Sequence, residues 1–199
     1  MTSPKELRKA TLAARDALPA GERRGKSAAI TETVLARPEI AESEHIFLYV
    51  SFRSEVETID LLRRLLASGK KISVPFTHVK EKYLDAIPIT DPDRQLVSGY
   101  QNIPEPSPEA RKTITPPGDI QVVLLPGSVF DLRGGRFGYG GGFYDRFVAS
   151  VPQAWRIGLA FDAQVVPQAP LQPHDELLDL VITESRVIVG HRREAMGKK

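Results

Sequence analysis

A short apolar run, a glycine-dense segment and the start of a helix follow one another in this chain, and this succession is its most constraining feature. The run from Val122 to Leu125 reads as a buried strand that stops at Pro126-Gly127. Six glycines then lie between residues 134 and 142, and helical spacing resumes at Tyr144. A strand, a glycine-rich loop and a helix start place unpaired backbone N–H groups around an anion. The pattern therefore predicts a phosphate-binding loop.

Arginines at 133, 136 and 146 add positive charge around this segment. Two other interpretations compete with a phosphate site: a mobile hairpin tip, or an RNA-binding arginine–glycine tract centred on Arg133-Gly134-Gly135-Arg136. The spacing matches neither the Walker motif nor the GxGxxG fingerprint. Glycine content alone leaves a phosphate site and a structural loop equally open.

Strands and helices alternate along the chain. Ser3 and Pro4 suit the start of a first helix, and the apolar spacing carries it to Leu18. Further helices are expected at 22–35, at 59–69 and from 144, and strands at 45–50, 71–76, 83–89, 120–126, 156–161, 180–183 and 186–189. Residues 90–119 are expected to form loops with at most one short helix, and 190–199 a frayed basic tail.

This alternation predicts βαβ units and a mainly parallel central sheet flanked by helices. The 199 residues suffice for one well-cored domain, and no composition break divides residues 1–199.

Composition excludes several classes of function. The net charge of +2 disfavours bulk nucleic-acid binding and suits a small anionic substrate. The absence of cysteine excludes disulfides, thiolate metal sites and cysteine nucleophiles. No apolar run approaches the ~20 residues that cross a membrane, and the charged N-terminus does not read as a signal peptide, so a cytoplasmic location is expected.

The long motif is more specific than its glycines. Pro-Gly-x-x-Phe-Asp at 126–131, followed by Arg-x-Gly-x-Gly-x-Gly-Phe-Tyr-Asp-Arg at 136–146, resembles the signature of the 5-formyltetrahydrofolate cyclo-ligase family. Similar family segments occur at Leu7-Arg8, at Glu55-Val56-Glu57-Thr58 and, more weakly, at 102–106. Two positions depart from the family pattern: Pro4 stands where a lysine is expected, with Lys5 one residue later, and Phe143 stands where tyrosine is common.

The resemblance implies a three-layer α/β/α fold and an enzyme that converts 5-formyltetrahydrofolate and MgATP to 5,10-methenyltetrahydrofolate, ADP and phosphate. It assigns catalysis to Arg136 and Tyr144, folate binding to Phe52, Glu57, Tyr139 and Phe143, and Mg²⁺ to Asp145 and Asp175. The residues that it assigns to ATP are Lys5, Arg8, Arg136, Phe137, Gly138, Tyr139, Gly140, Gly141, Gly142, Phe143 and Tyr144. The expected partner is a folate, which the family implies is polyglutamylated, and the expected state is a monomer.

The residues themselves leave simpler roles open. Glu55 and Glu57 would also be favourable charges at the N-terminus of a helix, and the aromatic side chains of the motif could equally pack in the hydrophobic core. Asp131 is expected to brace the loop through backbone amides, Asp179 to be structural, and His174 not to bind a metal, since Mg²⁺ prefers oxygen. The alternative functions are a phosphosugar isomerase, an acyl-CoA transferase, or a non-catalytic RNA binder.

Overall fold

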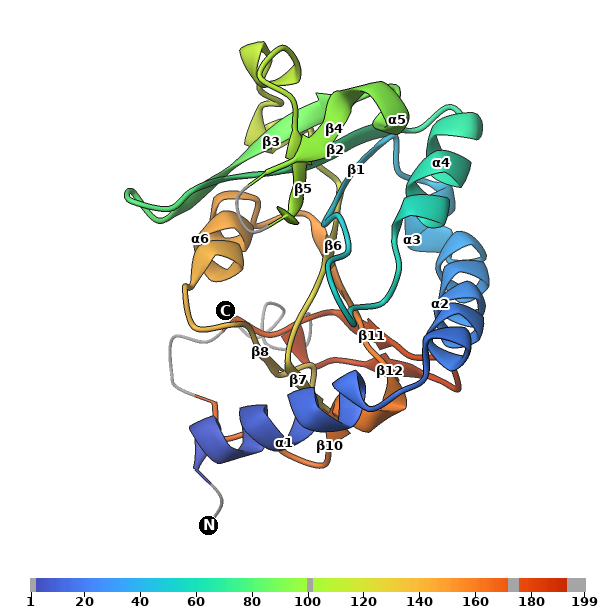
Figure 1. The fold of residues 1–199 in the computed structure, drawn as a ribbon, viewed down its shortest axis with the longest axis vertical. Helices are drawn as coiled ribbons and strands as arrows, with labels where there is room; N and C mark the ends of the chain where they lie inside the picture. Colours follow the sequence, from blue (N-terminus) through green and yellow to red (C-terminus); the bar gives the residue numbers. More distant parts are fainter. Residues whose placement is uncertain (1–2, 100–101, 172–175, 193–199) are drawn as a thin grey trace.

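A seven-stranded sheet forms the centre of the molecule in the computed structural model, which describes residues 3–99, 102–171 and 176–192 (Figure 1). The strand order is β12-β11-β9-β6-β1-β2-β3. The strands are β1 (His45–Leu48), β2 (Lys71–His78), β3 (Tyr83–Ile89), β6 (Val122–Leu125), β9 (Trp155–Leu159), β11 (Leu180–Ile182) and β12 (Val187–Val189). All neighbours pair in parallel except the two edge strands, β3 and β12. The predicted mainly parallel sheet is therefore confirmed.

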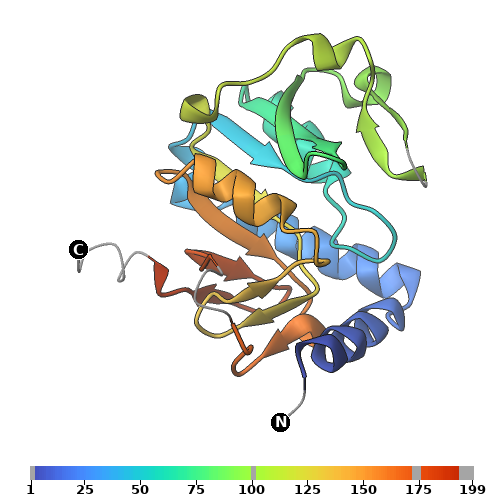
Figure 2. The same cartoon turned by 90° about the vertical axis from the view of Figure 1, so that its left-hand side faces the viewer.

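Helices cover both faces of this sheet (Figure 2). On one face, α2 (Ala20–Leu35) and α4 (Ile59–Ala67) pack on Ile46 and Leu48 of β1, and the short α3 (Pro38–Ala41) adjoins them. On the other, α6 (Phe143–Ser150) packs on Phe47, whose ring stacks on Phe147 at a centroid distance of 4.1 Å. Alternate residues of β1 therefore pack into two different cores, because successive side chains of a strand point to opposite faces of the sheet and both faces are covered. The three-layer α/β/α prediction is confirmed.

The neighbouring strands β1 and β6 send the chain to opposite faces. After β1 the chain enters α4 on one face, and after β6 it reaches α6 on the other. Such a reversal opens a crevice at the carboxyl ends of the two strands, where open α/β sheets bind their ligands. The fold therefore points to this edge of the sheet as the place for a site.

The segment between β6 and α6 is more structured than the sequence predicts. Strands β7 (Val129–Asp131) and β8 (Arg136–Phe137) form a hairpin, and β10 (Val165–Val166) joins β7 in a second, three-stranded sheet. The first helix, α1 (Pro4–Asp16), packs on β7 and on the 3₁₀ turn η4 (Asp162–Gln164) of this small sheet. Gly134 and Gly135 belong to the hairpin turn, so the open loop before α6 is residues 138–142, called the glycine loop below.

Residues 90–119 also contain more structure than the loops and single short helix expected. After α5 (Pro92–Gln95), β4 (Leu96–Ser98) pairs antiparallel with β5 (Pro104–Pro106), and the 3₁₀ turns η2 (Ala110–Lys112) and η3 (Pro117–Asp119) follow. Proline tolerates the edge of such a two-stranded sheet, and the proline content concealed the strands from the sequence pattern.

The predicted frayed tail from Gly190 is wrong for its first three residues. The amides of Gly190 and His191 donate to the carbonyls of Asp179 and Arg133, and Arg192 is buried with its guanidinium 2.8 Å from the Asp179 carboxylate. Asp179 is structural, as expected. Residues 193–199 lie outside the described part. Among the described helices, none is long and apolar enough to cross a bilayer.

Asp131 fixes the turn of the β7–β8 hairpin. Its fully buried carboxylate accepts hydrogen bonds from the amides of Gly135 (2.7 Å), Arg133 (2.9 Å) and Ala169 (2.9 Å), and from the Arg133 guanidinium (2.7 Å). Burial alone would raise the pKa of this carboxyl, but these donors outweigh it and hold the pKa below its ordinary value. The bracing role expected for Asp131 is confirmed. Because Arg133 is committed to Asp131, this segment is a folded turn and not the disordered tract that the RNA-binding interpretation needs.

We expect Asp131→Asn to lower the free energy of unfolding at pH 7 by about 3 kcal/mol, because it replaces a carboxylate that accepts from three amides and a guanidinium by a group that accepts fewer hydrogen bonds. A depressed folded pKa stabilises the fold above the unfolded pKa of about 3.9 and ceases to do so as the pH falls through the folded pKa. The gap between wild type and variant should therefore narrow at pH 3. Urea unfolding at both pH values measures it, with the exposed Asp60→Asn as control. A gap equally wide at pH 3 would contradict the role of the charge.

Candidate functional site

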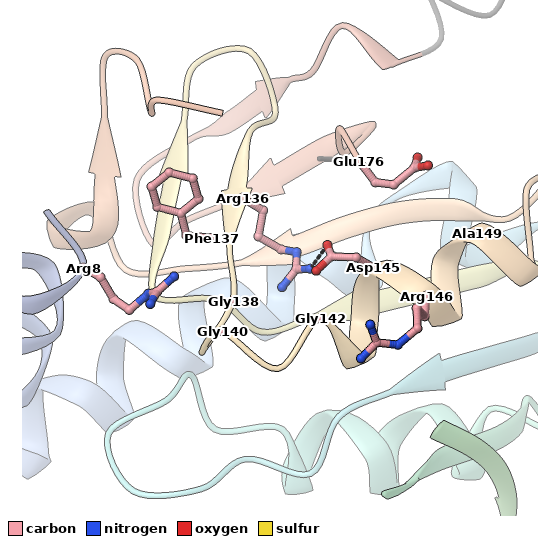
Figure 3. Close-up of a pocket in the computed structure, with 10 residues that line it drawn as sticks. All are labelled: Arg8, Arg136, Phe137, Gly138, Gly140, Gly142, Asp145, Arg146, Ala149 and Glu176. Atoms are coloured by element: carbon pink, nitrogen blue, oxygen red, sulfur yellow. Dashed lines mark hydrogen bonds and ion pairs between the residues drawn. The ribbon is translucent and has the colours of Figure 1, made fainter. Parts of the chain in front are cut away.

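A cavity of about 420 Å³ opens beside the glycine loop, formed mainly by the chain that follows β6 (Figure 3). Its walls come from α1, β8, the glycine loop, α6 and the segment before β11. The lining residues are Arg8, Arg136, Phe137, Gly138, Gly140, Gly142, Asp145, Arg146, Ala149 and Glu176.

The glycine loop presents free backbone donors. Within the described part of the chain, none of the amides of residues 138–142 donates a hydrogen bond, whereas the carbonyls of Gly138 and Gly141 accept from Ser128 Oγ (3.1 Å) and Arg146 Nη2 (2.6 Å). Gly140 and Gly142 have φ of +98° and +64°, which other residues adopt with strain. The loop thus holds the carbonyls of Gly138, Gly141 and Gly142 in internal bonds and leaves its N–H groups for another acceptor, such as an anion.

Three guanidinium groups surround these amides. Arg136 is buried and donates to the Asp145 carboxylate (2.5 Å) and to the Pro126 carbonyl (3.2 Å). Arg8 points from α1 toward Gly140, and its buried Nε has no hydrogen-bond partner within the described residues (Figure 3). Arg146 donates to the carbonyls of Gly141 (2.6 Å) and Lys82 (2.5 Å). The Arg8 side chain lines the cavity and makes no hydrogen bond or ion pair within the described residues, so its guanidinium is the group there that is most available to an anion.

Two carboxylates also line the cavity. Asp145 shares one oxygen with Arg136, and Glu176 pairs with the buried Arg156. No group of three metal-binding side chains occurs among the described residues, and the predicted metal ligand Asp175 lies outside them. Asp145 is therefore the one predicted metal ligand whose place in the cavity can be described.

The predicted site residues divide into two sets. Those that line the cavity are Arg8, Arg136, Phe137, Gly138, Gly140, Gly142 and Asp145. Those that do not line it are Lys5, Phe52, Glu57, Tyr139, Gly141, Phe143 and Tyr144. Lys5 is exposed in the first turn of α1. Arg133, expected to add charge near the loop, pairs with Asp131 instead.

The three aromatic residues around the glycine loop point away from the cavity. Phe143 packs against the α6-side core, and Tyr144 contacts both cores with its ring centroid 5.9 Å from the Arg136 guanidinium carbon. Tyr139 turns toward Glu55. Burial and the nearby Glu55 carboxylate raise the pKa of the Tyr139 and Tyr144 phenols well above the ordinary value. Both phenols are therefore protonated at neutral pH and can serve as hydrogen-bond donors.

The loop that follows β1, residues 51–58, lies against the glycine loop. The Tyr139 hydroxyl donates to Glu55 Oε1 at 2.5 Å and joins the two directly. Within the 51–58 loop, Glu57 has an exposed side chain and an amide that donates to Ser27 of α2 (3.0 Å), while the ring of Phe52 is half-buried beneath the Arg53 guanidinium. The segment predicted to bind folate and the segment predicted to bind phosphate thus meet at the crevice between β1 and β6.

The sequence reasoning missed three contributors. Glu176 lines the cavity, and Arg15 and Glu55 join the two loops through Tyr139. Arg146, which was expected to add charge around this segment, also lines the cavity. Arg15 carried a usable signal, because it follows Arg8 by seven residues and so lies on the same helix face. Glu55 carried no such signal, because a negative charge at this position is equally well explained by the N-terminus of a helix.

Comparison of this chain with known proteins finds its relatives in one family. The model of the 5-formyltetrahydrofolate cyclo-ligase family matches residues 1–184. The mouse 5-formyltetrahydrofolate cyclo-ligase is 30% identical over 84% of this chain and 87% of its own length. A mitochondrial cyclo-ligase of Arabidopsis thaliana is 29% identical over 80% of this chain and 66% of its own.

A solved structure supports the same assignment. The 5,10-methenyltetrahydrofolate synthetase of Aquifex aeolicus has a TM-score of 0.81 and 30% identity over 94% of this chain and 92% of its own. Its fold accounts for the mainly parallel sheet described above. With the motif, the fold and the cavity in agreement, this chain belongs to the 5-formyltetrahydrofolate cyclo-ligase family and is an enzyme of that activity.

Proposed function

We propose that the enzyme works by phosphorylating the formyl oxygen of 5-formyltetrahydrofolate with ATP and then closing the ring through N10. The formyl oxygen attacks the γ-phosphorus, and the bond from that phosphorus to the β,γ-bridging oxygen breaks to release ADP. N10 then attacks the activated formyl carbon and loses its proton, and the carbon–oxygen bond breaks to release phosphate. The products are 5,10-methenyltetrahydrofolate, ADP and phosphate. The observation that carries this proposal is that the backbone amides of the glycine loop, which lie beside Arg8 and Arg136, donate no hydrogen bond within the described residues.

The chain's own groups act by position and charge. The amides of residues 138–142 would hold the triphosphate, and the guanidinium of Arg8, which lines the cavity, would contact the phosphate that transfers. Arg136 is buried and fixed by Asp145, so its charge needs no reorganisation as negative charge develops on the phosphoryl oxygens. No side-chain nucleophile is required. Tyr144 packs beside Arg136 without lining the cavity, so its proposed catalytic role is to hold that guanidinium in place.

The carboxylates suit a divalent cation. Asp145 offers a hard oxygen donor at the cavity, the type that Mg²⁺ prefers, and Asp175 is the second proposed ligand. Bound Mg²⁺ would neutralise phosphate charge and orient the triphosphate.

The folate is proposed to lie along the 51–58 loop, with Glu57 at its polar pterin edge and Phe52 against its flat face. The exposed Glu57 side chain and the half-buried Phe52 ring are consistent with these contacts. A monomer in the cytoplasm remains the expectation, although the Arabidopsis relative is mitochondrial.

We expect purified protein to produce the methenyl chromophore from 5-formyltetrahydrofolate only when ATP and Mg²⁺ are both present. Absorbance recorded over time measures it, with omission of ATP as the control. Equal formation without ATP would contradict the phosphorylation step, and no formation under any condition would contradict the proposed reaction.

We expect Arg8→Ala and Arg136→Ala each to lower kcat by about 10²- to 10³-fold, the usual effect of removing a group that stabilises transition-state charge. Steady-state kinetics on protein shown to be folded by its circular dichroism measures this loss. The exposed Arg24→Ala of α2 is the matched control and should retain its activity. Near-normal rates in both cavity variants would rule out the phosphate role.

We expect Asp145→Asn to raise the Mg²⁺ concentration that gives half-maximal rate by at least about tenfold, because a charged oxygen ligand is lost. Mg²⁺ titration of the rate measures the shift, and excess Mg²⁺ should restore part of the activity. If Asp145 serves only to orient Arg136, excess Mg²⁺ will restore nothing.

A further inference from the structure

A chain of hydrogen bonds centred on Tyr139 links three separate segments. The Tyr139 hydroxyl accepts from Arg15 Nη1 of α1 at 2.8 Å and donates to Glu55 Oε1 of the 51–58 loop at 2.5 Å. Arg15 is 5% exposed and also donates from Nε to Ser54 Oγ at 3.0 Å. Ser54 in turn donates to Asp16. The charged residues of this network therefore sit where α1 meets both loops of the crevice.

The two carboxylate oxygens of Glu55 serve different loops. Oε1 accepts from Tyr139 of the glycine loop, whereas Oε2 accepts from the backbone amide of Phe52 at 2.9 Å. One rigid planar group thus fixes the turn of the 51–58 loop and the middle of the glycine loop at once. Burial raises the pKa of Glu55, while the donors from Tyr139 and Phe52 and the charge of Arg15 act against this rise.

The Tyr139 tether differs from the other anchors of the glycine loop. Ser128 and Arg146 donate to the carbonyls of Gly138 and Gly141, and they lie only ten and five residues from them along the chain. Tyr139 reaches across the crevice to segments more than 80 residues away. Because glycine-rich backbone loses much conformational freedom when ordered, a tether at the centre of such a loop has a large effect on where its amides lie.

We propose that Glu55 and Arg15 are positioning residues that act through the Tyr139 hydroxyl to hold the phosphate-binding loop in register with the folate-binding loop. This inference rests on the proposed function, since register matters only if the two loops carry the two reacting substrates. A misplacement of about 1 Å between reacting groups can cost about 10²-fold in rate. The network would therefore control the chemical step more than the binding of either substrate.

The test is a double-mutant cycle of Tyr139→Phe and Glu55→Met, each of which keeps the length of its side chain and removes the shared hydrogen bond. We expect each single variant to lower kcat by about tenfold, the effect of one hydrogen bond to a charged group, with KM for ATP changed by less than about threefold. Because both remove the same bond, the double variant should be no more than about twofold slower than the slower single variant.

Two matched variants accompany the cycle. Tyr83→Phe removes the hydroxyl of a tyrosine on the β2–β3 hairpin whose hydroxyl makes no hydrogen bond within the described chain, and it should leave kcat unchanged. Arg15→Lys, which can still donate to one of the two partners of Arg15, should retain more activity than Arg15→Ala. Thermal unfolding of every variant gives the folded fraction to which kcat is referred.

The outcomes separate the two levels of inference. A fall in melting temperature with unchanged kcat per folded molecule, or additive losses in the double variant, would overturn the positioning role and leave the proposed reaction standing. Wild-type protein that forms no methenyl product with ATP would overturn the proposed reaction, and the positioning role with it.

Discussion

The parallel pairing of β1 with β6 determines where every other part of the site lies. These two strands are neighbours at the centre of the sheet, and the chain leaves them toward opposite faces. The 51–58 loop and the glycine loop therefore open side by side at one edge, although some 80 residues separate them in sequence. The packing that fixes this geometry is apolar: Ile46 and Leu48 bury toward α2 and α4, and Phe47 stacks on Phe147 of α6. The two cores fit different side chains of β1, so this packing favours the observed register of β1 with β2 and β6.

This arrangement of strands and helices also determines where the charged side chains around the cavity lie. Arg136 is carried into the interior by β8 and held by Asp145 of α6, so a buried charge is compensated without help from solvent. Arg8 lies on α1, which packs on the small sheet, and its Nε is left unpartnered among the described residues. A positive group fixed in this way favours an anion that arrives from outside, which agrees with the proposed triphosphate.

The small sheet is the part of the structure that connects these features. Asp131 closes the β7–β8 turn by accepting from three amides and the Arg133 guanidinium, β8 carries Arg136 to the cavity, and α1 packs on β7. It also explains why an arginine–glycine segment that resembles a disordered tract is folded. Gly134 and Gly135 are closely packed against other parts of the chain, and the Arg133 guanidinium forms an ion pair with Asp131.

The sequence alone determined the class of fold, the order of most helices and strands, and the family motif, because apolar periodicity and local turn chemistry are written in consecutive residues. Most of the predicted site residues that line the cavity belong to that motif: Arg136, Phe137, Gly138, Gly140, Gly142 and Asp145, which Arg8 joins from α1. Local pattern could not reveal the β7–β8–β10 sheet or the β4–β5 pair, whose strands are only two or three residues long.

Only the tertiary structure decided which side chains of the motif face the cavity and which face away. Tyr139 sits between two lining glycines yet turns toward Glu55 and Arg15, partners that lie 84 and 124 residues away. Such contacts depend on how β1, β6 and α1 are brought together in space. A hydrogen bond between distant segments leaves no trace in the spacing of either one.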